Sequence, residues 1–265
     1  MTTRWNILII IGAALFWIQS SYAQGSIQTG FLDRTIDMAG SSYRYQVYVP
    51  SSYTPSSRWP VILFLHGAGE RGRDGLVQTQ VGLGAAIRQH PSRYPAIVVF
   101  PQAPPDSLWV GVPAQAAMAA LEKTTVEFQT DPDRIYLTGL SMGGNGTWYL
   151  AYRNPSKFAA VVPICGWVAP FNPWVARVET VVPGDSVAPF GAMARRLARV
   201  PVWIFHGEED GAVPVDQSRQ AATALMSADA AVQFTELPGV GHNSWDAAYG
   251  STKFTTWLFQ QRRRH

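Results

Sequence analysis

A serine flanked by two glycines is the residue best placed for covalent chemistry. The segment Gly139-Leu140-Ser141-Met142-Gly143 follows an apolar run at 134–138 and precedes a helical-looking stretch at 145–152. A strand, a sharp turn and a helix in this order form a nucleophile elbow, in which strained backbone lifts the serine hydroxyl clear of the sheet. The glycines are needed because any side chain there would collide with the neighbouring strand or helix. The pattern therefore predicts that Ser141 is a nucleophile.

A serine hydroxyl needs a general base, and His242 is the histidine best suited to that role. It lies in a glycine-rich segment at 238–245, after a strand-like run at 232–237, and comes late in the chain, as the order serine, acid, histidine requires. His66 and His206 each end an apolar run and precede a glycine, which favours a structural role for both.

The acid that orients this histidine is expected on the loop that follows the preceding strand, which spans 201–206. That loop carries Glu208, Glu209 and Asp210. A glycine follows Asp210, so a tight turn would aim its short side chain inward, and we favour it over the alternative, Glu209. The two glutamates are also compatible with an acidic surface loop that stabilises the next helix.

Acyl transfer also requires hydrogen-bond donors for the oxyanion that develops on the substrate. One is expected to be the backbone N–H of Met142, the residue after the nucleophile. The other is expected in the glycine-rich loop after the strand at 61–65, where Ala68 follows His66 and Gly67. Only the amide of Ala68 would act.

Five motifs form one ordered set along the chain. They are Leu65-His66-Gly67-Ala68-Gly69-Glu70-Arg71-Gly72, Pro101-Gln102 with Trp109, the run from Asp131 to Gly144, Pro163-Ile164-Cys165-Gly166, and Gly241-His242-Asn243-Ser244-Trp245-Asp246. The set resembles the secreted α/β-hydrolase esterases of the dienelactone-hydrolase and polyhydroxybutyrate-depolymerase type, often called carboxylesterases or predicted peptidases. The resemblance covers about residues 40–262.

By this resemblance, Ser141, Asp210 and His242 form a triad, and Ala68 and Met142 supply the oxyanion amides. The chain departs from the family at 167–199, which is longer and richer in proline and tryptophan than the usual connection. That departure affects the choice of substrate and not the chemistry.

The composition fits one large globular domain. The 265 residues are 47% hydrophobic and 15% charged, with a net charge of +3. Part of that charge lies in Arg262-Arg263-Arg264, which we expect to solvate the end of the last helix and complement its dipole. We therefore expect no nucleic-acid partner.

Residues 1–23 have the features of a signal peptide. Arg4 precedes an apolar run at 7–18, and Ser21-Tyr22-Ala23 places small residues where a signal peptidase cleaves. The run is shorter than the roughly 20 residues that span a membrane. We expect cleavage after Ala23, a secreted or periplasmic protein without a stable membrane anchor, and one catalytic domain over 24–265.

The sequence gives no sign of a metal or a cofactor. No histidine pair has metal-ligand spacing, and no glycine loop carries the lysine of a phosphate-binding loop. The single cysteine, Cys165, ends a strand-like apolar run and is expected in the core, without an adjacent basic partner that would make it a nucleophile. We expect an enzyme that needs no cofactor.

Alternating apolar runs and helix-length segments predict an α/β fold of the α/β-hydrolase type: a mostly parallel sheet flanked by helices. An antiparallel hairpin at 31–37 and 43–49 is expected to precede it. The expected strands are 61–65, 96–100, 134–139, 159–164, 201–206 and 232–237, and the expected helices are 76–89, 113–129, 143–153, 215–229 and 247–261.

Four tryptophans, Trp109, Trp167, Trp174 and Trp245, fall on expected loops at the catalytic end. They could line a groove for an aromatic or sugar-linked acyl group, while Trp109 and Trp245 could instead brace the loops of the triad. The segment 167–199, in which only 192–199 looks helical, is expected to form a partial cap that sets specificity. The alternative is a surface excursion packed on a neighbouring helix.

These features predict an exported serine carboxylesterase that acts through an acyl-enzyme on small-molecule or polymer-linked esters. The acyl group could be short aliphatic, feruloyl, acetyl on a sugar, or hydroxyalkanoate. One alternative is a serine peptidase resembling prolyl oligopeptidases, although the sequence shows no propeller domain that would gate peptides. Another is a carbohydrate- or polymer-binding protein that keeps a hydrolase fold without catalysis.

Overall fold

The computed structural model describes residues 28–173, 175–177, 179–184 and 188–263. It begins with a hairpin in which β1 (Gly30–Met38) pairs antiparallel with β2 (Ser41–Val49). Ala39 and Gly40 form the turn with φ values of 50° and 74°, the left-handed conformation of a tight two-residue hairpin. The expected hairpin is present and is two residues longer in each strand.

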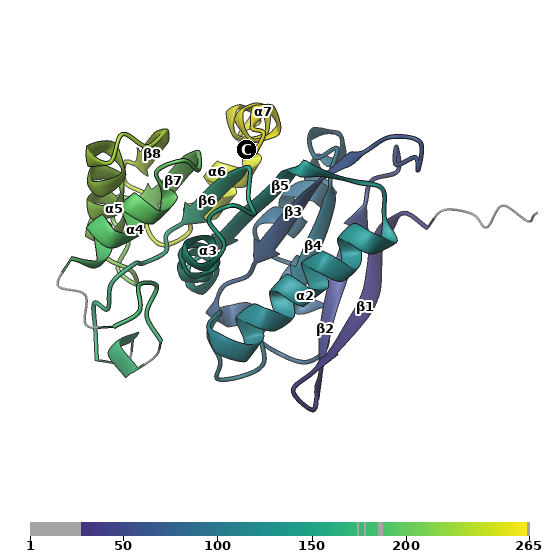
Figure 1. Ribbon diagram of the computed structural model, residues 1–265, viewed down its shortest axis with the longest axis horizontal. Helices are drawn as coiled ribbons and strands as arrows, with labels where there is room; N and C mark the ends of the chain where they lie inside the picture. The colour runs from purple at the N-terminus through teal and green to yellow at the C-terminus, as the bar shows by residue number, and fades with distance from the viewer. Residues whose placement is uncertain (1–27, 174, 178, 185–187, 264–265) are drawn as a thin grey trace, which may run out of the picture.

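Eight strands form one sheet in the order β1-β2-β4-β3-β5-β6-β7-β8 (Figure 1). Strand β2 joins β4 antiparallel, and all pairs from β4 to β8 are parallel. The remaining strands are β3 Trp59–Leu65, β4 Ile97–Pro101, β5 Thr130–Leu140, β6 Ala160–Ile164, β7 Val202–Gly207 and β8 Val232–Leu237. The predicted α/β-hydrolase class, with a mostly parallel sheet and an antiparallel hairpin, is confirmed.

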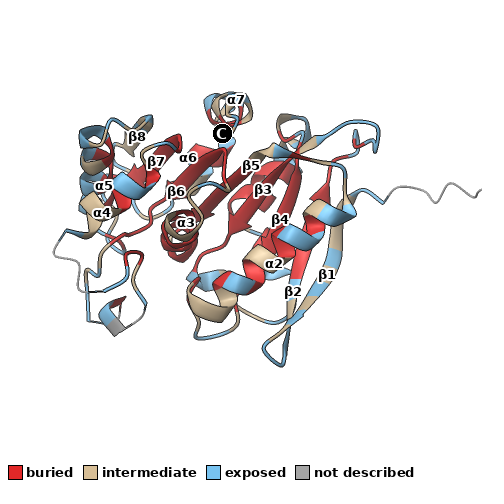
Figure 2. Ribbon diagram, in the orientation of Figure 1, coloured by how far each residue is buried: buried red, intermediate tan, exposed pale blue. Residues whose placement is uncertain are grey.

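Helices cover both faces of this sheet, so its central strands are buried on both sides (Figure 2). One face packs against α2, α3, α4 and α5, and the other against α1, α6 and α7. The helices are α1 Leu83–Gln89, α2 Gly111–Glu127, α3 Met142–Arg153, α4 Pro189–Leu197, α5 Asp216–Ser227, α6 Trp245–Gly250 and α7 Thr252–Gln260.

Strand β3 shows why these strands read as continuous apolar runs. Val61, Leu63 and Leu65 point into the core under α2 and α3, whereas Ile62 and Phe64 point into the core under α1 and α6. Successive side chains of a strand face opposite sides, so both sets must be apolar when both faces are covered.

Two predicted helices differ from the observed ones. The helix expected at 76–89 begins only at Leu83, because Gly82 adopts φ 65° and interrupts it. The helix expected at 247–261 is two helices, because Ser251 takes extended backbone angles between α6 and α7. The helical piece expected at 192–199 is α4, which begins at Pro189.

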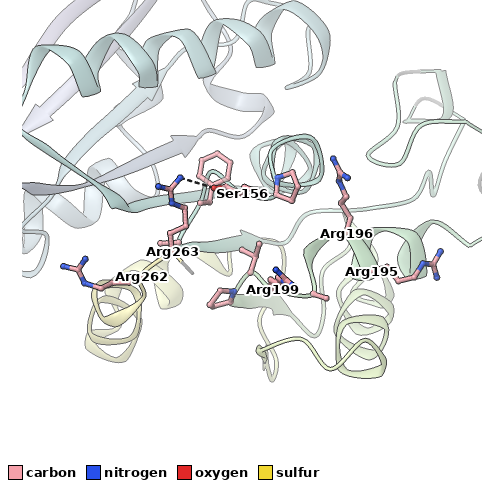
Figure 3. A pocket seen from close by; sticks show the side chains of 12 residues that line it. Ser156, Arg195, Arg196, Arg199, Arg262 and Arg263 are labelled. Atoms are coloured by element: carbon pink, nitrogen blue, oxygen red, sulfur yellow. Dashed lines mark hydrogen bonds between the residues drawn. The ribbon is translucent and has the colours of Figure 1, made fainter. Parts of the chain in front are cut away.

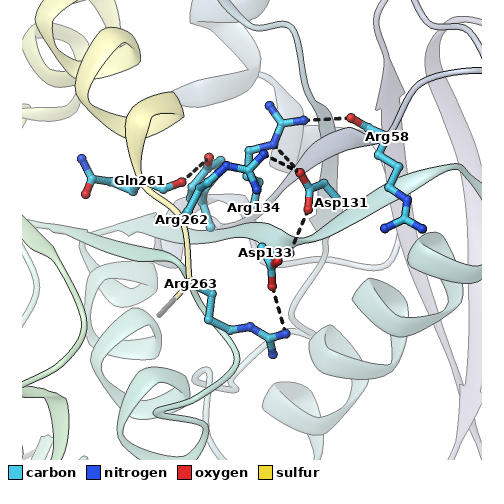
Figure 4. A network of polar contacts seen from close by, with 8 residues as sticks. Arg58, Asp131, Asp133, Arg134, Gln261, Arg262 and Arg263 are labelled. Carbon is cyan, nitrogen blue, oxygen red and sulfur yellow. Dashed lines mark hydrogen bonds and ion pairs between the residues drawn. The ribbon is translucent and has the colours of Figure 1, made fainter. Parts of the chain in front are cut away.

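The C-terminal arginines have a different role from the one expected. Instead of solvating the end of α7, Arg262 and Arg263 lie against the start of β5 (Figure 4). Arg262 Nη2 is 3.3 Å from Asp131 Oδ2, and Arg263 Nη2 is 3.2 Å from Asp133 Oδ1. The Arg263 amide also donates to the Asp133 carbonyl at 2.9 Å. The chain end is therefore tied to the sheet by long-range contacts that the local sequence does not reveal.

The predicted signal peptide, 1–23, lies outside the described residues. Within the described ranges, no helix combines the length and the apolar character needed to span a bilayer.

Candidate active site

Ser141 occupies the turn between β5 and α3, as the nucleophile elbow requires. Its φ of 53° and ψ of −116° lie in a region that a side-chain-bearing residue rarely adopts. The Ser141 amide donates to the Ile164 carbonyl at 2.9 Å, which fixes the turn to β6. A Cβ at Gly143 would lie 1.9 Å from the Leu65 carbonyl oxygen, so only glycine lets α3 approach β3 this closely.

The structure brings Ser141, His242 and Asp210 together from three separate loops. His242 Nε2 lies 2.9 Å from Ser141 Oγ, and His242 Nδ1 lies 2.7 Å from Asp210 Oδ2. Because Asp210 is an acceptor, Nδ1 carries a proton and Nε2 is left free to accept one from the serine. Ser141, His242 and Asp210 thus form one continuous hydrogen-bonded line, the geometry that a nucleophile, its base and an orienting acid require.

The Asp210 carboxylate is fully buried yet held in its ionised form. Burial raises its pKa, but hydrogen bonds from His206, His242 and the amides of Val213 and Ala212 outweigh burial and hold the pKa well below its usual range. Glu209, the alternative acid, is exposed, as is Glu208. Of the three carboxylates, only Asp210 contacts His242 among the described hydrogen bonds.

His206 supports that carboxylate from the buried side. Its Nε2 faces two acceptors, the Val213 carbonyl at 3.0 Å and Asp210 Oδ2 at 3.1 Å, so this nitrogen carries the proton. The other nitrogen, Nδ1, then accepts from the Ser218 hydroxyl at 2.7 Å. His206 therefore has the expected structural role: it holds the Asp210 carboxylate in place.

His66 fixes the peptide that carries the Ala68 amide. The Ala103 N–H donates to His66 Nε2 at 2.9 Å, so the proton is on Nδ1, which donates to the Gly67 carbonyl at 2.6 Å. In a trans peptide the Ala68 N–H then points the opposite way from this carbonyl. Burial lowers the His66 pKa to about 4, which keeps the ring neutral near neutral pH.

The two expected oxyanion donors belong to segments that meet at the serine. Met142 is the first residue of α3, where backbone N–H groups are unpaired and the helix dipole favours negative charge. Gly67, which directly precedes Ala68, lies so close that a Cβ built on it would be 3.7 Å from Ser141 Cβ.

Cys165 lies beside the triad, which the sequence did not suggest. It is buried as expected, but the expectation that it has no basic neighbour is wrong. Its sulfur, an Asp210 carboxylate oxygen and a His242 ring nitrogen lie within 4.8 Å of one another. Burial raises the thiol pKa to about 12, so it stays protonated. The sequence signal for this proximity is the position of Cys165 directly after β6, which lies between β5 and β7, the strands that precede Ser141 and Asp210.

The four tryptophans proposed to line a groove have different surroundings. Trp109 is 1% exposed and donates through Nε1 to the His66 carbonyl at 2.9 Å, and Trp167 is 5% exposed. Neither offers an indole face to a substrate, which corrects that expectation, and Trp109 braces the loop that holds His66. Trp245 is half-buried, and its ring centroid lies 5.4 Å from that of His242. Trp174 lies outside the described residues.

The described parts of 167–199 pack on α3 and α5. The amides of Val168 and Ala169 donate to Gln217 Oε1, and Arg153 donates to the Val181 carbonyl and to Glu179. Further apolar residues join the core under these helices, namely Val175, Val181, Val182, Met193 and Leu197. These contacts favour the alternative of an excursion packed on neighbouring helices.

A family model agrees with this geometry. The model of the prolyl oligopeptidase family matches residues 106–261, more than half of the chain and a range that includes Ser141, Asp210 and His242. The chain belongs to the prolyl oligopeptidase family. The predictions of an α/β-hydrolase fold and of a serine hydrolase are thereby confirmed at the level of the family.

Several proteins that are similar to this chain are named as esterases. A thermostable esterase of known structure is 32% identical with a TM-score of 0.74, and the match covers 88% of this chain and 63% of that one. An acyl-protein thioesterase 1 of Gibberella zeae is 28% identical over 113 residues, 43% of each protein. An uncharacterized secreted protein of Arthroderma benhamiae is 26% identical over 71% of this chain and 22% of its own. The chain thus spans less than half the length of these two curated relatives.

The close approach at Gly143 gives a testable prediction. Replacing Gly143 by alanine should lower the free energy of unfolding by about 3 kcal/mol or more, because the new Cβ would meet backbone that cannot move aside. Gly250→Ala is the control, since a Cβ there meets nothing within 4 Å. Denaturant unfolding followed by circular dichroism measures both. Equal stability of the two variants would contradict this account of the elbow.

Proposed function

We propose that this chain is an exported serine carboxylesterase that hydrolyses carboxylic esters through an acyl-enzyme. The observation that carries the proposal is the line of contacts from Ser141 Oγ to His242 Nε2 at 2.9 Å and from His242 Nδ1 to Asp210 Oδ2 at 2.7 Å. This arrangement activates a hydroxyl that is otherwise a weak nucleophile.

In the acylation half, His242 Nε2 takes the hydroxyl proton while Ser141 Oγ attacks the ester carbonyl carbon. The negative charge that forms on the carbonyl oxygen is stabilised by the N–H groups of Ala68 and Met142. When the tetrahedral intermediate collapses, the bond to the alcohol oxygen breaks and His242 gives that oxygen its proton. The acyl group remains esterified to Ser141, and the buried Asp210 carboxylate stabilises the transient imidazolium.

In the deacylation half, a water molecule gives a proton to His242 and its oxygen attacks the acyl carbon. The same amides stabilise the second tetrahedral intermediate. Collapse releases the carboxylic acid, and Ser141 Oγ recovers its proton from His242. The cycle ends with every residue in its starting protonation state and consumes one ester and one water.

A groove beside His242 is suited to the alcohol part of the ester. Since His242 must protonate the departing oxygen, the alcohol has to lie on the histidine side of Ser141. Next to the segment that follows His242, a cavity of about 600 Å³ lies between α1 and α6 and is lined by Trp245, Asn243 and Asp246, with Gln80 and Gln89 on the α1 side. An indole face with amides and a carboxylate around it suits a sugar or an aryl alcohol. We place specificity here, and not in the segment 167–199.

Export is supported from two sides. Residues 1–23 have the pattern of a signal peptide, and the Arthroderma benhamiae relative is called a secreted protein.

A peptidase is the second candidate, and the name of the family favours it. The same triad could cleave an amide, but the esterase names of the similar proteins favour an ester substrate. Turnover of an ester and an amide of the same acyl group separates the two. A comparable kcat/KM for both would establish the peptidase.

Single substitutions test the proposed triad. Ser141→Ala should abolish hydrolysis of p-nitrophenyl butyrate, and Asp210→Asn should lower kcat by about 10⁴-fold, because the imidazole would lose its tautomer control. Glu209→Gln is the matched control and should leave kcat unchanged within about twofold. Steady-state kinetics on folded variants provides the measurement. Full activity of Ser141→Ala would overturn the function, and loss in Glu209→Gln alone would move the acid to Glu209.

Acetate esters that differ only in the alcohol test the groove. Trp245→Ala should lower kcat/KM for an acetylated sugar by about tenfold or more, because one well-packed aromatic contact with the alcohol is lost. The kcat/KM for ethyl acetate should change little, because its ethyl group is too small to fill the groove. Trp245→Phe should restore part of the loss. An equal fall for both esters would mean that Trp245 only braces His242 and does not choose the alcohol.

A further inference from the structure

A second cavity lies at the opposite end of the sheet from Ser141 and is surrounded by arginines (Figure 3). It encloses about 520 Å³ between the end of α4, the segment before β6 and the C-terminal segment after α7. Among the described residues, its lining includes five arginines and no carboxylate; the arginines are Arg195, Arg196, Arg199, Arg262 and Arg263. We refer to these five residues as the arginine rim.

Most of this charge has no counter-charge in the described part of the chain. Arg195 and Arg199 are exposed and form no ion pair or hydrogen bond there, and Arg196 donates only to the Tyr152 carbonyl. Arg262 shares Asp131 with Arg134, which is closer at 2.7 Å. Folding therefore places five positive charges around one cavity with few counter-charges, and an external anion would compensate this excess charge.

Arg263 adds an independent observation. Its Nη2 pairs with Asp133 and its Nη1 donates to the Ser156 carbonyl at 3.3 Å, but its buried Nε has no hydrogen-bond partner among the described residues. Most buried polar groups in proteins have a hydrogen-bond partner, so this N–H could donate to an oxygen of a bound anion. This donor belongs to a residue that lines the cavity.

Helix capping accounts for only part of the rim. Arg195 and Arg196 lie in the last turn of α4, where positive charge complements the helix dipole. Arg262 and Arg263 come from a different segment, after the end of α7. Their meeting with the end of α4 around one cavity is a feature of the tertiary fold and not of a single helix.

The arrangement indicates the kind of anion. Guanidinium groups form paired hydrogen bonds to carboxylate, sulfate or phosphate oxygens. In Figure 3 the labelled side chains of Arg195, Arg196 and Arg262 point in different directions and do not converge on one point. A single small ion could not contact them all, whereas a chain with repeated charges could.

The shape and the other lining residues narrow the partner further. A flat bilayer cannot enter a cavity, and the large exposed apolar residues in the described part of the chain, Leu76, Val77, Val126 and Met226, lie elsewhere. A single-stranded nucleic acid would need exposed aromatic rings for stacking, and Phe158, the only aromatic residue in the described lining, is buried. We propose that the arginine rim binds an acidic polysaccharide, such as a polyuronate or a sulfated glycan.

Binding at the rim leaves the triad accessible. Ser141 follows the C-terminal end of β5, whereas the cavity lies at Ala159 and Pro201, just before β6 and β7 begin. The polymer would hold the protein by the end of the sheet that carries no chemistry. This inference does not depend on the proposed esterase activity.

Binding of the full chain to polygalacturonate, with the neutral polymer dextran in parallel, tests the proposal. The variant Arg195→Ala/Arg199→Ala should weaken polygalacturonate binding by about tenfold or more and reduce its salt dependence, because fewer counterions are released. The matched control, Arg73→Ala/Lys253→Ala, removes the same charge at two exposed positions outside the rim and should change affinity less than about twofold. Hydrolysis of ethyl acetate should be the same in both variants.

Four results would overturn the proposal. They are equal weakening in the rim and control variants, equal binding to dextran, no binding to polygalacturonate at low salt, and tighter binding to phosphatidylglycerol vesicles than to the polymer. The first means attraction by net charge alone, and the last means a membrane surface. A protein that binds the polymer at the rim but does not hydrolyse esters would support this inference while refuting the proposed esterase.

Discussion

The close approach of α3 to the sheet is the constraint on which the rest of the site depends. Gly143 lies against the Leu65 and His66 carbonyls, and Gly144 lies against Gly166, each too close for a side chain. This packing holds Ser141 in an otherwise unfavourable conformation, because a strained residue persists only when its surroundings fix it. It also places the first turn of α3 and the loop after β3 next to each other, so the serine and the expected oxyanion amides are set by one contact.

Around this contact, two buried histidines orient the polar groups of the site through hydrogen bonds. His66 and His206 do not face substrate, yet each has its tautomer fixed by one donor and at least one acceptor. One orients a peptide and the other supports the Asp210 carboxylate. A buried carboxylate without such donors would take up a proton and could no longer hold the imidazole. Four hydrogen-bond donors keep the Asp210 carboxylate ionised although its side chain has no contact with solvent.

The sequence predicted the features that depend on local pattern. Strands β3, β4, β6 and β7 appear as short apolar runs because both of their faces are covered. The order of Ser141, Asp210 and His242 follows from a fold in which loops after parallel strands meet at one edge. The features it missed depend on tertiary contacts. Cys165 reaches the triad only because β6 lies between β5 and β7, and Arg262 and Arg263 find their partners 131 and 130 residues away. Likewise, the sequence places Trp109 on a loop at the catalytic end, and only the packing of α3 over it at Gly146 shows that it is buried.

The central claim is that Ser141 is an activated nucleophile in the folded protein. Mass spectrometry after exposure to a fluorophosphonate tests it most directly, since this reagent forms a covalent bond only with an activated serine. We expect one adduct per chain, located on the peptide that contains Ser141, and no adduct on Ser141→Ala or on unfolded protein. An unlabelled but folded wild-type chain, or an adduct on another residue, would contradict the account.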